Sequence, residues 1–182
     1  MSQTILIPFS GRLYLNNDRF TTWNQYGSNY YHLNRTIGKP RNDDILRDLR
    51  FDTNSVGGFN IPFKSELKSF SFTGYTDVRS NETINFRVHF IAFKVAEDGS
   101  KQDLRVVYED YTQRQALVSS KRLNIKIDFE ELQKQKGFED AEFDLNEDEF
   151  LMVVFERDGN YSNTSSRRYI YMNSGSLVLE KR

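Results

Sequence analysis

Polar and apolar residues alternate along several stretches of this chain, which is the pattern of β-strands with one buried face. Residues 122–129 show it most regularly, since every second residue is Leu, Ile or Phe and the residues between them are Arg, Asn, Lys and Asp. Residues 68–73 alternate Phe with Ser and Thr, and Gly74 is expected to end this strand. We therefore predict two strands, the first with one face in water.

The stretch 83–95 also alternates, but its apolar positions move by one residue after Phe90. A slip of one residue turns the side chains to the other face of a sheet, and a β-bulge absorbs it most simply. We therefore predict a bulge near residues 90–92. Residues 150–155, Phe-Leu-Met-Val-Val-Phe, are apolar without alternation, which predicts a central strand covered on both faces.

Four weaker strands are predicted between turn-forming residues. They are residues 4–9, 104–108, 168–172 and 176–179. About eight strands, together with 15 Phe and 10 Tyr and no regular alternation with helices, favour an all-β fold. We predict an antiparallel two-sheet sandwich that resembles a jelly roll and contains one or two short helices.

Short helices are predicted at two places. Asp128 can cap a helix over residues 129–136, because Glu131 follows three residues later and Gly137 is a suitable stop. A second short helix is expected after Asn42 or Asp43.

The whole chain, residues 1–182, is predicted to be one domain, because no repeat or low-complexity linker divides it. Residues 16–58 differ from the rest, since they mix aromatic residues with Asn, Gly, Arg and Thr and show little periodicity. We expect this segment to be an extended arm or a long loop.

Charge is spread unevenly, although the net charge is only -1 and the pI is about 6.2. Residues 1–50 carry seven Lys or Arg against four Asp or Glu, a balance of +3, and residues 130–158 carry three against eleven, a balance of -8. The two regions could attract each other between neighbouring copies or form two solvated faces. Because a basic excess is lacking, we expect no nucleic-acid partner.

The composition offers little material for catalysis. The absence of cysteine excludes disulfides, thiolate metal sites and a cysteine nucleophile, and only two histidines are present. His89 is expected on the polar side of its strand, at a surface or an interface. No Gly-rich segment has the spacing of a phosphate-binding loop. We therefore predict a protein that is not an enzyme and has neither a cofactor nor a metal ion.

An acidic run, residues 139–149, resembles the start of a calcium loop, because oxygen-bearing side chains alternate from Asp144. Glu149 replaces the glycine that such a loop requires, and Phe155 stands where a bidentate Glu is needed. The run is interpreted as a solvated acidic turn, with an irregular cation site as the alternative. Two carboxylates that meet across strands would be the requirement for a glycosidase, a residual alternative.

Residues suited to binding are more plentiful than residues suited to catalysis. Aromatic rings on polar stretches can anchor a protein interface, cover the ends of the sandwich or stack on a sugar. Guanidinium groups could pair with the acidic run of another copy. The candidate binding residues are Trp23, Tyr26, Tyr30, Tyr31, His32, Arg47, Arg50, Tyr161, Arg167 and Arg168.

The order of these segments resembles that of structural proteins of tailed bacteriophages. In those proteins an apolar-Pro-Phe unit is followed by a spacer, an alternating strand, a turn and a longer alternating strand. The same order is found here from Ile61-Pro62-Phe63 to residue 72 and then over residues 81–88. Residues 13–31 and 150–180 are similar to the beginning and the end of such proteins.

This resemblance implies a β-sandwich virion component that acts through protein–protein assembly, as a tail or collar appendage or a capsid decoration. The implied partners are other virion proteins and further copies of the chain, and the implied location is a virion assembled in the host cytoplasm. A compact subunit is favoured over a long fibre, because no collagen-like or coiled-coil segment is present. The alternative is a tail-fibre module that binds a host receptor or a host surface glycan. Neither a signal peptide nor a membrane span is predicted.

Overall fold

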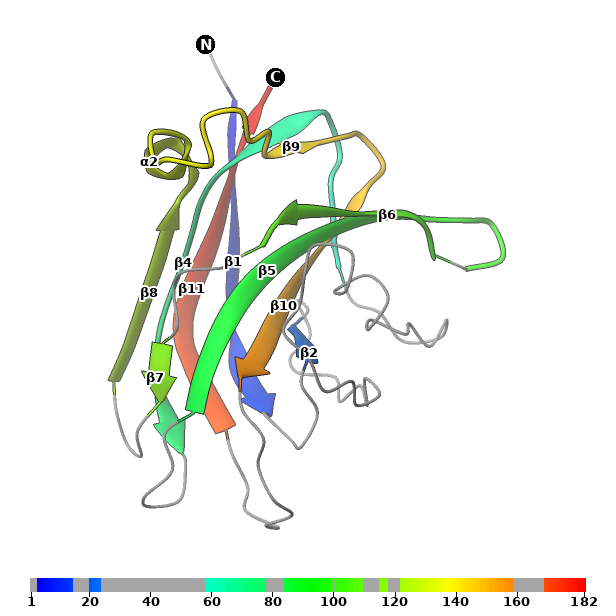
Figure 1. The fold of residues 1–182 in the computed structure, drawn as a ribbon. Coiled ribbons are helices and arrows are strands. Elements are labelled where there is room, and N and C mark those ends of the chain that lie inside the picture. The colour runs from blue at the N-terminus through cyan, green and yellow to red at the C-terminus, as the bar shows by residue number, and fades with distance from the viewer. Residues whose placement is uncertain are drawn as a thin grey trace.

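The computed structural model describes residues 3–14, 20–23, 58–77, 84–99, 101–109, 115–117, 122–158 and 169–182. These residues form two antiparallel β-sheets that face each other, with one short helix at the end where both termini lie (Figure 1). The predicted all-β two-sheet sandwich is confirmed. In the ranges above, no helix has the length and apolar character needed to cross a membrane.

Each sheet has four strands in a continuous order and one or two short strands beside them. The five-stranded sheet has the order β1 (Thr4–Tyr14), β11 (Tyr169–Lys181), β4 (Ser65–Asp77) and β8 (Arg122–Asp128), and β9 (Asp144–Leu145) pairs with β4. The six-stranded sheet has the order β2 (Phe20–Trp23), β10 (Phe150–Asp158), β5 (Ile84–Val95) and β6 (Lys101–Tyr108), with β3 (Phe59–Asn60) paired to β10 and β7 (Gln115–Leu117) paired to β5.

The strands pair in a nested order once the short β3, β7 and β9 are set aside. The first pairs with the last (β1 with β11), the second with the second to last (β2 with β10), and the third with the third to last (β4 with β8). The middle two, β5 and β6, form a hairpin. Apart from this hairpin, consecutive strands of the nested set, such as β4 and β5, lie in different sheets. Both sheets depend on contacts between distant parts of the sequence.

Aromatic rings fill the space between the sheets. Phe70 of β4 meets Phe90 of β5 edge to face, with ring centroids 5.1 Å apart, and Phe72 of β4 meets Phe155 of β10 at 6.0 Å. Such ring pairs add about 0.5–1.5 kcal/mol to the stabilisation that burial of their area provides. All four rings are buried. The abundance of Phe in the sequence thus supplies the core.

Three strand predictions can be compared directly with the structure. In β8 every second residue is buried, as the alternation indicated. Residues 151–155 of β10 are buried throughout and β10 lies between β2 and β5, so the predicted central strand is confirmed. The predicted strands 168–172 and 176–179 are parts of one strand, β11, in which Asn173 is an extra residue opposite β4.

Helix α2 (Phe129–Gln133) begins at the predicted residue. The Asp128 side chain accepts a hydrogen bond of 3.3 Å from the backbone N–H of Glu131, which is the expected N-cap. The helix ends earlier than the predicted residue 136, and Gly137 adopts φ +95° in the turn that follows. Phe129 and Leu132 of α2 are buried and close the end of the sandwich where the termini lie.

Gly74 does not end a strand, contrary to the prediction. β4 continues through it to Asp77 instead of stopping at residue 73. A Cβ atom at Gly74 would lie 2.0 Å from the carbonyl oxygen of Tyr171 in β11, so the two backbones are too close for a side chain at this position. The register shifts here, next to the extra Asn173. Gly74 therefore allows a bulge within a continuous ladder.

A register shift also occurs at the predicted place in β5, but the extra residue lies in its neighbour β6. Phe90 pairs with Tyr108 and the following residue pairs with Val106, which leaves Val107 unmatched. The pairing of β5 with β10 on its other side is unbroken. Residues 88–93 are all buried, so both faces of β5 are covered and the slip in the apolar pattern requires no change of face.

The predicted arm, residues 16–58, is only partly described. Phe20–Trp23 form β2 and pair with β10, so this part of the segment belongs to the six-stranded sheet. Residues 24–57 lie outside the described residues, as does the helix predicted after Asn42 or Asp43.

Candidate functional site

Most of the predicted binding residues lie outside the described ranges. These are Tyr26, Tyr30, Tyr31, His32, Arg47, Arg50, Tyr161, Arg167 and Arg168. Trp23 is the last residue of β2, where its backbone pairs with that of Val153 in β10. The binding roles assigned to these residues stay predictions.

His89 is buried, so its predicted surface position is wrong. Its exposed fraction is 0%. It alternates with Phe90 of the core and therefore lies on the other face of the six-stranded sheet, where Ile91 and Val154 are also buried. Because this face is covered as well, a polar position in the alternation is not a solvent position here.

The acidic run contains a turn that is held by an ion pair between a buried carboxylate and a half-buried guanidinium. The Glu149 carboxylate accepts hydrogen bonds from Nε and Nη2 of Arg105 in β6, at 2.9 and 2.6 Å. It also accepts hydrogen bonds from the backbone N–H of Asn146 at 2.7 Å and from its side-chain amide at 3.1 Å. Only 3% of the Glu149 side chain is exposed. The residue that replaces the glycine of a calcium loop thus attaches this turn to β6.

The same contacts bear on the alternative of a cation site. Glu149 is occupied by Arg105 and Asn146, and Asp144 Oδ2 accepts a hydrogen bond of 2.9 Å from Arg182. Within the part of the chain that is described, no group of three or more His, Asp or Glu side chains is arranged to hold a metal ion. The interpretation as an acidic turn and the alternative of a cation site both stay predictions.

The pKa of Glu149 lies below its usual value. Burial alone would raise the pKa of Glu149, but the hydrogen bonds from Arg105 and Asn146 favour the ionised carboxylate and outweigh burial. A carboxyl group with a lower pKa in the folded chain stabilises the fold above its unfolded pKa. This contribution is lost as the pH falls through the folded pKa.

We expect Glu149→Gln to lower the free energy of unfolding by about 1.5–3 kcal/mol at neutral pH. The difference from the wild type should shrink as the pH falls below about 4.5, because the wild-type carboxyl group then becomes protonated as well. Urea unfolding between about pH 7 and about pH 3 measures it. Glu147→Gln, at an exposed position of the same turn, is the control and should have little effect at any pH. A deficit of Glu149→Gln that is the same at every pH would contradict this linkage.

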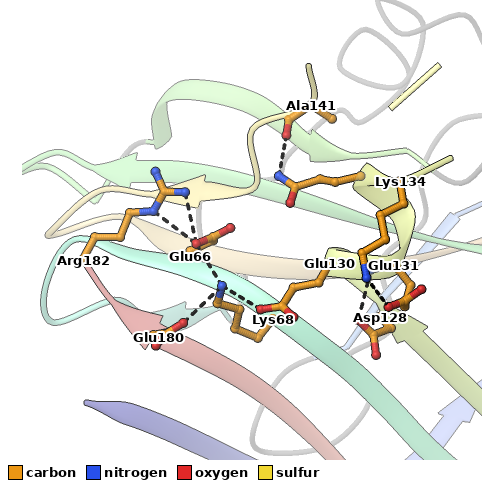
Figure 2. A network of polar contacts seen from close by, with 10 residues as sticks. Glu66, Lys68, Asp128, Glu130, Glu131, Lys134, Ala141, Glu180 and Arg182 are labelled. Atoms are coloured by element: carbon orange, nitrogen blue, oxygen red, sulfur yellow. Dashed lines mark hydrogen bonds and ion pairs between the residues drawn. The ribbon is translucent and has the colours of Figure 1, made fainter. Parts of the chain in front are cut away.

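A second set of charges connects three elements at the end of the sandwich where the termini lie (Figure 2). The Lys68 ammonium of β4 is 3.2 Å from Glu66 of the same strand, 3.0 Å from Glu130 of α2 and 3.1 Å from Glu180 of β11. Arg182 follows β11 and forms a further ion pair of 3.1 Å with Glu66. The helix and the two strands are therefore joined by charge as well as by packing.

The pKa of Lys68 is raised above its usual value. Burial alone would lower the pKa of Lys68, but the hydrogen bonds with Glu130, Glu180 and Glu66 together outweigh burial. Lys68 is therefore protonated throughout the physiological pH range. An ammonium group held among three carboxylates acts as an electrostatic link between elements rather than as a proton donor or acceptor.

The surface of the five-stranded sheet that points away from the core, which we call the outer face, differs from these charged sites. It comprises Leu6 and Pro8 of β1, Tyr171, Ser174, Ser176 and Val178 of β11, Ser69, Ser71, Thr73 and Tyr75 of β4, and Arg122, Asn124, Lys126 and Asp128 of β8. Hydroxyl groups meet across β4 and β11 in its centre. Ser71 and Ser176 are 3.2 Å apart, and Thr73 and Ser174 are 2.9 Å apart.

Apolar side chains stand toward both ends of the outer face. Tyr75 and Tyr171 are stacked at one end, with ring centroids 4.7 Å apart and planes 12° from parallel. This separation matches the spacing of neighbouring strands, about 4.8 Å, so each ring covers one face of the other. Toward the other end Leu6 is 61% exposed beside Val178. The sequence indicated the alternation of residues 68–73 and 122–129 but not which strands lie beside each other, because these rows join segments that are far apart in the chain.

Comparisons with known proteins identify no family for this chain. No protein-family profile and no curated protein sequence matches the chain. One solved structure, described as "Structure of infectious bursal disease virus Gx strain", is similar with a TM-score of 0.34 and 9% sequence identity. The similarity covers 100% of this chain and 33% of the viral chain, so this chain spans about a third of the length of that one. At so low a TM-score the similarity supports no argument about fold or function.

Proposed function

We propose that this chain is a non-enzymatic virion structural protein that acts through protein–protein assembly, as a tail or collar appendage or as a capsid decoration. The outer face is the observation that carries the proposal. Its centre consists of small hydroxyl side chains without charge, and apolar side chains are exposed toward both ends. A second protein can cover such an uncharged centre without removing charges from water, and the exposed Leu6 and Tyr75 add apolar area to the contact.

The nested strand pairing supports the same proposal. With the short β3, β7 and β9 set aside, the eight remaining strands of the described residues pair first with last, as the strands of a jelly roll do, and viral capsid domains and lectins use that fold. A fold alone does not decide between such functions. The resemblance of the sequence to structural proteins of tailed bacteriophages favours the virion, with other virion proteins and further copies as partners. Assembly would take place in the host cytoplasm.

The ion pairs of Lys68 and Arg105 also suit a structural protein with a fixed shape. Lys68 joins β4, α2 and β11, and Arg105 holds the acidic turn through Glu149. These contacts stabilise the shape of the sandwich near its termini. A subunit that must present a fixed surface to its neighbours gains from such links.

A module that binds a host receptor or glycan is the second candidate, because lectins share this connectivity. Tyr75 is 43% exposed and offers an aromatic ring to a sugar. Tyr171 covers one face of this ring, so a sugar would have to stack on the other face. Binding on a glycan array that disappears with Tyr75→Ala would favour this second candidate.

The purified chain is expected to self-associate. Size-exclusion chromatography with light scattering, at concentrations from about 1 to about 100 μM, should give a mass that is a multiple of 21.5 kDa. The association should weaken on dilution. A mass of one chain over the whole range would contradict assembly between copies.

A further inference from the structure

We infer that the outer face binds the outer face of a second copy, and that the two copies are related by a two-fold axis that lies in the contact plane and runs across the strands. The inference rests on the proposed function and names the surface and the partner of its assembly. Four observations lead to it: the small side chains in the centre of the outer face, the positions of its charged residues, the obstacles to strand addition at the β1 edge, and the area of the outer face.

The centre of the outer face allows two copies to come close. Ser71 bonds with Ser176, and Thr73 bonds with Ser174, within one copy. Each pair thus forms one hydrogen bond within its own copy, and the remaining hydroxyl proton of each pair can be donated to an oxygen of the second sheet. No charge has to be removed from water there. Small side chains also let two sheets approach without interlocking long groups.

The register shows which residues would meet. Asp128 lies in the same row as Ser69 and Val178, and Arg122 lies in the same row as Tyr75 and Tyr171. These rows stand at equal distances from the middle of the hydroxyl rows. A two-fold rotation about an axis across the strands places the Asp128 row of one copy over the Arg122 row of the other. Asp128 therefore meets the partner's Arg122. Val178 likewise meets the partner's Tyr171.

An axis along the strands would give a poorer match. It would place β1 of one copy over β8 of the other with the rows unchanged, and the exposed Leu6 would then cover the partner's Asp128. Burying a carboxylate under an apolar side chain is unfavourable. The axis across the strands places Leu6 over the position of Arg12 in the second copy, but it also brings Asp128 together with the oppositely charged Arg122. This charge pair favours the axis across the strands, whereas aligned packing of the two sheets is possible with either axis. The interface is isologous, so the Asp128–Arg122 contact occurs twice.

Among the described strands β1 lies at the edge of its sheet, and this edge is a weaker candidate for the same partner. Pro8 lies within this edge strand and has no N–H group to donate. The register of β1 also shifts between Phe9 and Gly11. Both features hinder the addition of a further strand. The face is therefore favoured over the edge.

The outer face is large enough for a specific contact. Four strands at about 4.8 Å spacing and seven residues at a rise of about 3.3 Å give about 440 Å² in projection for each copy. Accessible area follows the side chains and is larger than this projection. Two copies thus approach the lower part of the range for specific interfaces, about 1,200 Å² in total.

The first test places a long charged side chain in the centre of the face. Ser71→Arg should raise the dissociation constant of the self-association about hundredfold, because two copies of the new guanidinium would be buried near each other. Gln102→Arg is the matched control, since Gln102 is exposed on β6 of the other sheet. It should associate like the wild type. Light scattering over the same concentration range measures all three proteins.

The second test uses the absence of cysteine from the chain. Ser71→Cys, a conservative change, should form a covalent dimer with a short bis-maleimide linker, and Gln102→Cys should not. This variant decides the question if Ser71→Arg does not fold. Association of Ser71→Arg at wild-type strength, or no cross-link with Ser71→Cys while the wild type associates, would overturn this interface and leave assembly standing. A wild type that stays a single chain would contradict the proposed assembly itself.

Discussion

Replacing Arg105 with alanine is expected to lower the free energy of unfolding by about 2–4 kcal/mol, less than the loss of a fully buried pair would, because the Arg105 side chain is 35% exposed. The Glu149 carboxylate is 3% exposed and receives two hydrogen bonds from Arg105. Without that guanidinium, a buried charge would lack its cation, and the contacts from Asn146 are too few to replace it. Urea or guanidinium unfolding measures the loss.

Lys94→Ala provides the matched control on the same hairpin. Lys94 pairs with Asp103 at 3.7 Å, and their side chains are 49% and 69% exposed. Exposed pairs of this kind contribute little, so the loss should be below about 0.5 kcal/mol. In a double-mutant cycle, Arg105→Ala combined with Glu149→Gln should cost less than the sum of the single changes. An Arg105→Ala loss as small as that of Lys94→Ala would show that the ion pair does not hold the turn.

Gly74→Ala is expected to lower the free energy of unfolding by about 3 kcal/mol or more. The added Cβ would lie 2.0 Å from the carbonyl oxygen of Tyr171, and that oxygen belongs to the backbone of the neighbouring strand. One strand would have to move away from the other, which disrupts the ladder between β4 and β11. Thermal and chemical unfolding measure the effect, together with the yield of folded protein.

Gly99→Ala separates this clash from the ordinary effect of losing a glycine. Gly99 has φ +82°, and a Cβ there would have no neighbour within 4 Å. Its replacement should cost only about 1–2 kcal/mol, through the backbone conformation. If Gly74→Ala is no less stable than Gly99→Ala, the close approach of β4 and β11 does not constrain the fold.

Sequence patterns predicted those parts of the fold that depend on neighbouring residues. The alternation of β8 and the apolar run of β10 act locally, and both were located correctly. The N-cap at Asp128 depends on residues within one turn and was also found. Gly74 misled the prediction, because its role depends on the bulge at Asn173 in another strand. A lone glycine has the same appearance whether it ends a strand or permits a close approach.

The candidate sites were harder to predict, because each combines segments that are far apart in the chain. Arg105 and Glu149 are 44 residues apart, and Ser71 and Ser176 are 105 apart. The composition pointed to the acidic run, but no local pattern indicates which basic side chain would pair with Glu149. The burial of His89 likewise depends on what covers the second face of its sheet. Pairing of strands, rather than residue type, defines these places.

The nested pairing has a consequence for how the chain reaches its folded state. The β5–β6 hairpin joins strands that are close in sequence, whereas Thr4 of β1 meets Glu180 of β11. Loop-closure entropy grows with sequence separation, so the inner hairpin closes at the lowest cost and the outermost ladder closes at the highest. Folding with so many non-local contacts takes milliseconds to seconds. Until β11 docks, β4 has an open edge that can recruit a strand from another chain, so the yield of folded protein depends on suppressing aggregation during this interval.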